Sequence, residues 1–248
     1  MLGIDLYWLP LGAGGHSVRV NGRVFEALVA LRERRPRCDL YHSALQVNVP
    51  EGRYVIEQAP AGAAGAERGV LVDGAVGVGA AGRFRLFRYE VRCWRDGVIP
   101  DIAEAVESPL RLSDDLGCAR QLLELVPQVP SLVWGRDESG AGEMWNSNSV
   151  ISWLIARSDL DVDSIEPPLG GRAPGWRAGI DVARRRDLRP GSERRRLPCV
   201  PVEADRLEAL DRLLDHRLVF TDDAERAQRE GLEVGAGAQN GRCLLLDE

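Results

Sequence analysis

Apolar and polar residues alternate along several short stretches in the first half of the chain, which is the pattern of half-buried β-strands. Residues 40–49 alternate, the turn-forming Pro50-Glu51-Gly52-Arg53 follows, and residues 54–57 resume the alternation, which predicts a β-hairpin. Residues 84–94 are the best single predicted strand, and the apolar runs at 4–11 and 70–72 predict two more. We therefore expect an antiparallel sheet of several strands.

Spacings of three and four residues between apolar positions predict helices elsewhere in the chain. One amphipathic helix is expected within residues 23–35, ending before Pro36. Helical patterns recur over residues 102–110 and 113–126, and a short apolar helix is expected over residues 150–156. Together these elements predict an α+β fold in which helices pack on one side of the antiparallel sheet.

The chain is expected to divide near residue 180. Residues 167–176 are rich in Pro and Gly, which cannot hold regular structure and mark a loop or a boundary. Beyond residue 180, two short arginine runs belong to a linker, and four leucines recur at helical spacing, Leu207, Leu210, Leu214 and Leu218. A length of 248 residues suits one domain with an appendage. We expect a domain over residues 1–180 and an Arg-rich linker with a helical extension over residues 181–248.

Charge and apolar runs limit the expected partners. The formal net charge of −6 supplies no basic field that would attract nucleic acid. No uncharged apolar run approaches the roughly 18 residues of a membrane helix. Residues 1–15 carry Asp5 and no preceding basic residue, unlike a signal peptide. We therefore expect a cytoplasmic protein with no nucleic-acid or membrane partner, and the sequence leaves its oligomeric state open.

The sequence contains no pattern typical of a metal or nucleotide site. Its five cysteines are scattered, without C-x-x-C or Cys/His spacing, and we interpret them as reduced thiols. The glycines at 12–15 do not form the G-x-G-x-x-G fingerprint of a dinucleotide-binding loop. We expect no metal and no cofactor.

Nucleophilic catalysis requires a nucleophile, a base within hydrogen-bond reach, a group that orients the base, and donors for an oxyanion. Ser147 lies at the start of the expected helix, where free N–H groups and the helix dipole favour developing negative charge. Of the three histidines, His42 is the best candidate base because a strand holds it. Glu57, on the neighbouring strand, could orient the imidazole if both side chains face the same side of the sheet. Simpler interpretations stay open, with Ser147 as a helix N-cap, His42 as an ordinary strand histidine and Glu57 as a solvated carboxylate.

The segment Leu40-Tyr41-His42-Ser43-Ala44-Leu45, with Asn146-Ser147-Asn148-Ser149-Val150 later in the chain, resembles the circularly permuted papain-like superfamily. That superfamily includes the NlpC-like peptidases, the lecithin:retinol acyltransferase family and the PPPDE peptidases. The resemblance spans roughly residues 40–156. In those relatives the second segment typically reads Asn-Cys-Asn or Asn-Cys-Glu before an apolar helix, and the cysteine is the nucleophile. The resemblance implies a papain-like core with Ser147 at the nucleophile position.

Serine at this position leaves three interpretations open: an engineered replacement of cysteine, a natural serine nucleophile, or a natural pseudoenzyme that binds without turnover. The expected function is hydrolysis or transfer of an acyl group at an amide, thioester or ester, with Ser147 as nucleophile, His42 as base and Glu57 as orienting group. The alternative is a catalytically inactive papain-like binding protein. We expect a peptide, acyl or small-molecule substrate to contact four nearby side chains, those of Asn146, Asn148, Trp145 and Trp134. The two tryptophans could equally belong to the core.

Overall fold

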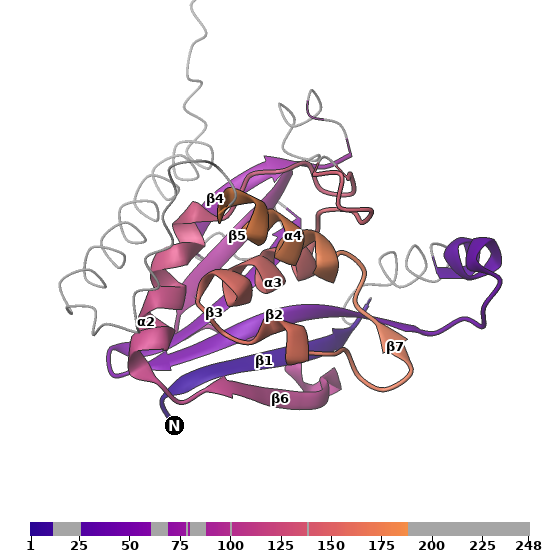
Figure 1. The fold of residues 1–248 in the computed structure, drawn as a ribbon. Helices are drawn as coiled ribbons and strands as arrows, with labels where there is room; N and C mark the ends of the chain where they lie inside the picture. Colours follow the sequence, from indigo (N-terminus) through magenta and orange to yellow (C-terminus); the bar gives the residue numbers. More distant parts are fainter. Residues whose placement is uncertain are drawn as a thin grey trace, which may run out of the picture.

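The computed structural model describes residues 1–11, 26–60, 69–77, 79, 88–99, 101–137 and 139–187. The protein is an α+β fold in which helices cover one face of an antiparallel sheet, as the sequence predicted (Figure 1). The domain boundary expected at residue 180 falls inside a helix, Trp176–Asp187 (α4). The helical pattern expected around Leu207–Leu218 lies outside the described residues.

The sheet has the strand order β4-β5-β3-β2-β1-β6, and neighbouring strands in this order are antiparallel. Their bounds are Gly3–Pro10 (β1), Asp39–Val49 (β2), Gly52–Pro60 (β3), Val70–Ala75 (β4), Arg88–Arg95 (β5) and Val106–Ser113 (β6). A two-residue strand, Gly171–Arg172 (β7), pairs in parallel with the start of β2. The predicted hairpin and the predicted strands near residues 4–11 and 70–72 are confirmed. The strand predicted over residues 84–94 is confirmed from Arg88 onward, and residues 84–87 lie outside the described part.

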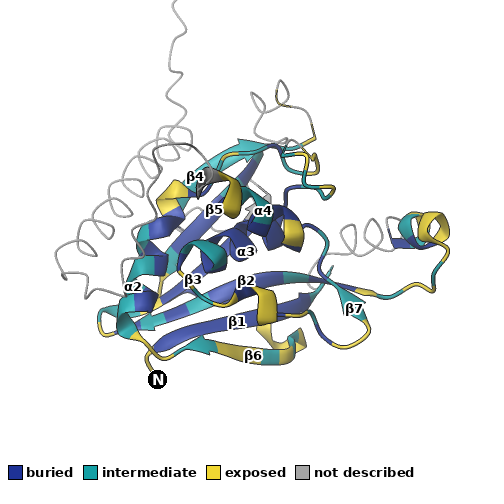
Figure 2. Ribbon diagram, in the orientation of Figure 1, coloured by how far each residue is buried: buried dark blue, intermediate teal, exposed yellow. Residues whose placement is uncertain are grey.

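The helices pack mainly against one face of the sheet, which we call the helix face. Besides α4 they are Leu116–Leu125 (α2) and Ser147–Arg157 (α3), with short 3₁₀ turns at Ile102–Glu104, Val126–Gln128 and Val162–Ser164. Alternate strand side chains, such as Trp8 and Leu45, join these helices in the main core. Figure 2 shows the buried strands beneath the helices. Residues 26–33 form a further helix, predicted from the sequence, that stands to one side of the sheet in Figure 1.

The opposite side of the sheet, which we call the second face, is also buried in part. Side chains that alternate with those of the main core, among them Leu9, Ala44 and Val55, form a smaller apolar cluster there. Ile99, from the connection between β5 and β6, packs onto this cluster and is 1% exposed. The central strands therefore have buried side chains on both faces.

Strands β2 and β3 separate part of the way along their length. They pair from Val49 and Gly52 as far as Leu45 and Ile56. Beyond that point β3 continues along β5, whereas β2 continues along β1 and meets β7 at its first residues. Figure 1 shows the two groups of strands diverging. Part of the β2 edge is therefore free to bond with other parts of the chain.

Two expectations from the sequence are wrong. The helix expected over residues 102–110 is a single 3₁₀ turn at Ile102–Glu104 followed by the edge strand β6. The apolar residues of β6 fit a period of two as well as a helical spacing, and an edge strand tolerates Pro109 because its missing N–H breaks no central ladder. The second concerns the cysteines, because Cys118 is disulfide-bonded, whereas Cys38 and Cys93 form no disulfide.

Candidate functional site

The start of α3 is fixed by a reciprocal capping box. Asn146 has an extended backbone, and its side-chain oxygen accepts hydrogen bonds from the N–H groups of Asn148 at 2.9 Å and Ser149 at 3.3 Å. In return the Ser149 hydroxyl accepts from the N–H of Asn146 at 3.0 Å. Asn146, which the sequence assigned to substrate contact, is thus the helix cap, and its side chain is buried.

Asn148 ties the start of α3 to the free edge of β2. Its side-chain N–H group donates to the carbonyl oxygens of Tyr41 and Pro174, each at 2.9 Å, and its Oδ1 accepts from the Ser43 hydroxyl at 2.9 Å. The side-chain oxygen and nitrogen are therefore both bonded to the protein, and the residue is 2% exposed. Asn148 holds the helix at the point where β2 leaves β3, and it has little capacity left for a ligand.

Ser147 is the first residue of α3 and is 8% exposed. Its hydroxyl has no hydrogen-bond partner among the described residues. The N–H groups of Asn148 and Ser149 are bonded to the Asn146 side chain, and that of Val150 is bonded to the Asn146 carbonyl. The sequence therefore placed Ser147 correctly at a helix start, but no base among the described residues is hydrogen-bonded to its hydroxyl.

His42 lies on the second face, across the sheet from Ser147. The register of β1 and β2 runs without interruption and pairs Leu9 with His42 and Trp8 with Ser43. Leu9 belongs to the cluster of the second face, whereas Trp8 and the Ser43–Asn148 hydrogen bond belong to the helix face. Because side chains alternate along a strand, His42 points away from α3. The structure does not bring Ser147 and His42 together.

The surroundings of His42 keep its imidazole neutral at physiological pH. Burial lowers the pKa of His42 to about 4, and the nearby Asp101 carboxylate opposes this shift. Asp101 precedes the 3₁₀ turn Ile102–Glu104, in the same β5–β6 connection that carries Ile99. The other two histidines of the chain, His16 and His216, lie outside the described residues.

Glu57 does share the second face with His42, which was the condition for it to orient the imidazole. The register, however, places Glu57 directly opposite Arg92 of β5. Arg92 is 2% exposed and pairs with Glu90 at 2.7 Å. Glu57 is therefore a buried carboxylate beside a buried guanidinium, an arrangement typical of structural ion networks.

The two tryptophans of the expected substrate site differ in their surroundings. Trp145 is 2% exposed and belongs to the main core, which is the second of the two interpretations left open by the sequence. Trp134 is half-buried and packs edge-on against Tyr89, with ring centroids 5.8 Å apart. Its backbone bridges to Val76 beyond the end of β4. Trp134 therefore packs at the ends of β4 and β5, and Trp145 belongs to the main core.

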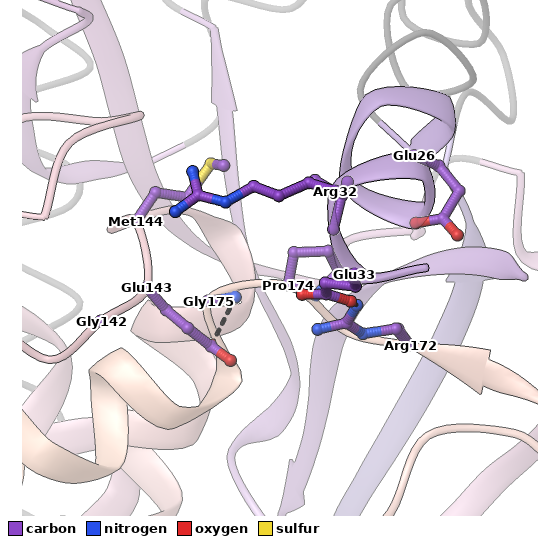
Figure 3. A pocket seen from close by; sticks show the side chains of 10 residues that line it. Glu26, Arg32, Glu33, Gly142, Glu143, Met144, Arg172, Pro174 and Gly175 are labelled. Carbon is purple, nitrogen blue, oxygen red and sulfur yellow. Dashed lines mark hydrogen bonds and ion pairs between the residues drawn. The ribbon is translucent and has the colours of Figure 1, made fainter. Parts of the chain in front are cut away.

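A pocket of about 350 Å³ opens beside the start of α3. One wall is the helix at residues 26–33, and the other walls are the segments 142–144 and 172–175 (Figure 3). Pro174 lines the pocket, and its carbonyl oxygen accepts hydrogen bonds from the side chains of Asn146 and Asn148. Gly175 also lines it, with φ +86°. A Cβ on Gly175 would lie 2.4 Å from the Asn146 side-chain oxygen, so glycine is required there.

Four charged groups form a connected chain along the helical wall of the pocket. Arg35 binds both Glu26 and Glu33, and Arg172 binds Glu33 at 2.8 Å. The Arg35 hydrogen bonds, together with the backbone N–H of Cys38, lower the pKa of Glu26 to about 2. These carboxylates and guanidinium groups neutralise one another and fix the helix beside β7.

No group of histidine, cysteine and acidic side chains suited to a metal ion occurs in the described ranges, and none of the helices there is long and apolar enough to cross a membrane. The chain matches no family model, no curated protein and no solved structure at a significant level.

Sequence reasoning missed the residues that line the pocket. Arg32 fell within the predicted amphipathic helix and Arg172 within the segment rich in Pro and Gly, whereas Glu143 and Met144 belonged to no predicted element. Nothing in their local sequence marks them, because the pocket joins three segments that are distant along the chain. The one local signal is Pro174-Gly175, which permits the close approach to Asn146.

Proposed function

We propose that the protein binds a small ligand without transforming it, as a non-catalytic protein related to papain-like enzymes. The observation that carries this proposal is the position of His42 on the face of the sheet opposite Ser147. A serine hydroxyl is a weak nucleophile at neutral pH and needs an adjacent base. No base among the described residues is hydrogen-bonded to Ser147, so its hydroxyl can accept or donate a hydrogen bond but is not activated as a nucleophile there.

The two flanking asparagines support the same proposal. The side-chain oxygen and nitrogen of Asn146 and Asn148 are both occupied by hydrogen bonds within the protein. These residues therefore account for the Asn-Ser-Asn pattern through helix capping and attachment to β2, independently of catalysis. The pocket of about 350 Å³ beside them lies within the usual size range of small-molecule sites.

A fluorophosphonate probe tests the proposal on the full chain. The probe labels serines that are activated by a neighbouring base, and intact mass with peptide mapping locates the adduct. We expect no adduct on Ser147 from weakly acidic to alkaline pH. The matched variants are Ser147→Ala, which removes the hydroxyl, and His42→Gln, which removes the imidazole.

An adduct on Ser147 that disappears in His42→Gln would contradict the proposal and restore the hydrolase or acyltransferase function. Equal background labelling of the unsubstituted chain and Ser147→Ala is the result expected of a binding protein. A Ser147 adduct that persists in His42→Gln would also contradict the proposal, because it would require a base other than His42.

A further inference from the structure

Arg32 differs from the other charged residues that line the pocket beside α3. The two glutamates of the helical wall, Glu26 and Glu33, are bound by Arg35 and Arg172. Arg32 lies on the same helix, yet it has no ion pair among the described residues. Neither glutamate has Arg32 among the groups that lower its pKa. The Arg32 guanidinium is therefore a cation at the pocket that forms no ion pair with the described residues.

The third acidic residue that lines the pocket, Glu143, is hydrogen-bonded to the backbone. Glu143 accepts hydrogen bonds from the N–H groups of Gly175 at 2.9 Å and Arg177 at 3.2 Å, at the start of α4. A carboxylate at a helix N-terminus is stabilised by those donors and by the helix dipole, which in turn offset part of its charge. Glu143 keeps its negative charge, but its carboxylate already accepts two hydrogen bonds, so Arg32 is the charged side chain of the pocket whose donors are left for a ligand.

The direction of the Arg32 side chain places that charge over the pocket. Figure 3 shows Arg32 extending from the helical wall across the opening toward Met144 on the facing segment. Three apolar side chains, those of Val29, Met144 and Pro174, line the same pocket and are half-buried. An apolar surface below a free guanidinium suits a ligand that has an apolar body and one anionic end.

We propose that this pocket binds a small organic carboxylate, with the carboxylate on Arg32 and the apolar body against Val29, Met144 and Pro174. The assignment rests on the proposed binding function and specifies its ligand class. A planar guanidinium can bind a carboxylate through two parallel hydrogen bonds, which a lysine ammonium cannot reproduce. The side chain therefore sets a preference for acids over the corresponding amides.

Titrations of phenylpropanoate and phenylpropanamide into the full chain test this assignment, followed by the backbone amide shifts of Met144 and Gly175. We expect the acid to bind at least about tenfold more tightly than the amide. Arg32→Gln should weaken acid binding at least about tenfold, and Arg32→Lys should restore part of it. The matched control is Arg37→Gln, an exposed arginine that does not line the pocket, and it should change the affinity less than about twofold.

A free acid and the carboxyl terminus of a peptide share this chemistry. Acetyl-glycyl-leucine and its C-terminal amide separate the two sources, since tighter binding of the peptide acid than of phenylpropanoate would identify a peptide terminus. Equal affinity for acid and amide, an unchanged affinity in Arg32→Gln, or no binding by either acid would overturn the assignment. A Ser147 adduct with the fluorophosphonate would overturn the non-catalytic function alone and would leave an Arg32-dependent preference for acids standing.

Discussion

Replacement of Asn148 by alanine tests the structural role of the residue most closely associated with Ser147. The substitution removes the donor to the Tyr41 and Pro174 carbonyls and the acceptor for the Ser43 hydroxyl. The Pro174 oxygen keeps a bond from the Asn146 side chain at 2.8 Å, so two buried groups lose their partner. At about 1–3 kcal/mol for each of the two orphaned groups, we expect Asn148→Ala to lower the free energy of unfolding by about 2–6 kcal/mol.

Urea unfolding followed by tryptophan fluorescence measures this loss, because Trp145 and Trp153 are buried near α3 and report its packing. Asn148→Asp keeps the volume but removes both side-chain N–H groups, and we expect at least the same loss. The control is Asn48→Ala, whose half-buried side chain makes only long contacts of 3.4 and 3.5 Å and should cost less than about 1 kcal/mol. If Asn148→Ala were no more costly than Asn48→Ala, the attachment of α3 to β2 through Asn148 would be refuted.

Two further perturbations follow from the same part of the fold. Gly175→Ala should destabilise the protein by about 2–4 kcal/mol in urea unfolding, because its Cβ would meet the Asn146 side chain at 2.4 Å at a positive φ. The control Gly170→Ala also has a positive φ, +77°, but its Cβ would meet no atom within 4 Å, so it should cost only about 1–2 kcal/mol. Similar losses at both glycines would contradict the contact. Burial lowers the pKa of His42 from 6.5 to about 4, so the folded state binds fewer protons than the unfolded state between these values. Stability is then complete above pH 6.5 and falls by about 1–3 kcal/mol toward pH 4, and His42→Gln should flatten this dependence when unfolding is measured at both ends. An equal slope in the variant would contradict the lowered pKa of His42.

Local patterns were sufficient to predict most of the strands and helices. The alternation of residues 40–57 around Pro50 and Gly52 predicted the β2–β3 hairpin, and the Asn-Ser-Asn-Ser sequence indicated where α3 begins. Such patterns fail where two periods fit the same residues. In β6, Val106 and Leu110 fit a helical spacing, but with Ser108 and Leu112 they also fit the period of two that the edge of the sheet selects.

The relation between His42 and Ser147 could not be predicted, because it depends on which face of β2 the helices cover. A strand that is buried on both faces gives no hydrophobic signal for this choice. In β2, Ser43 faces the helices although it is polar, while apolar Ala44 faces the other way. A shift of one residue in the β1–β2 register would have placed His42 toward α3. The predicted pairing of Ser147 with His42 therefore depended on which face of β2 carries His42, and the sequence leaves this open.

The pocket could not be predicted for a different reason. Its lining comes from residues 26–33, 142–144 and 172–175, which the fold brings together over long sequence separations. The arginine that we assign to ligand binding is one of several in its segment, Arg32, Arg34, Arg35 and Arg37. Only the ion pairs of Arg35 and Arg172 with the two glutamates distinguish Arg32, and these ion pairs depend on tertiary structure.

The most direct test of the separation between Ser147 and His42 is the reactivity of a thiol placed at the serine position. In Ser147→Cys, the rate of alkylation by iodoacetamide as a function of pH gives the pKa of the new thiol. The same measurement in the double variant, Ser147→Cys with His42→Gln, shows whether the imidazole changes this pKa. The opposite-face arrangement predicts the same midpoint in both variants, since the sheet lies between the two side chains. A midpoint more than about one pH unit lower in the single variant, lost when His42 is replaced, would show a thiolate–imidazolium pair and contradict the non-catalytic function.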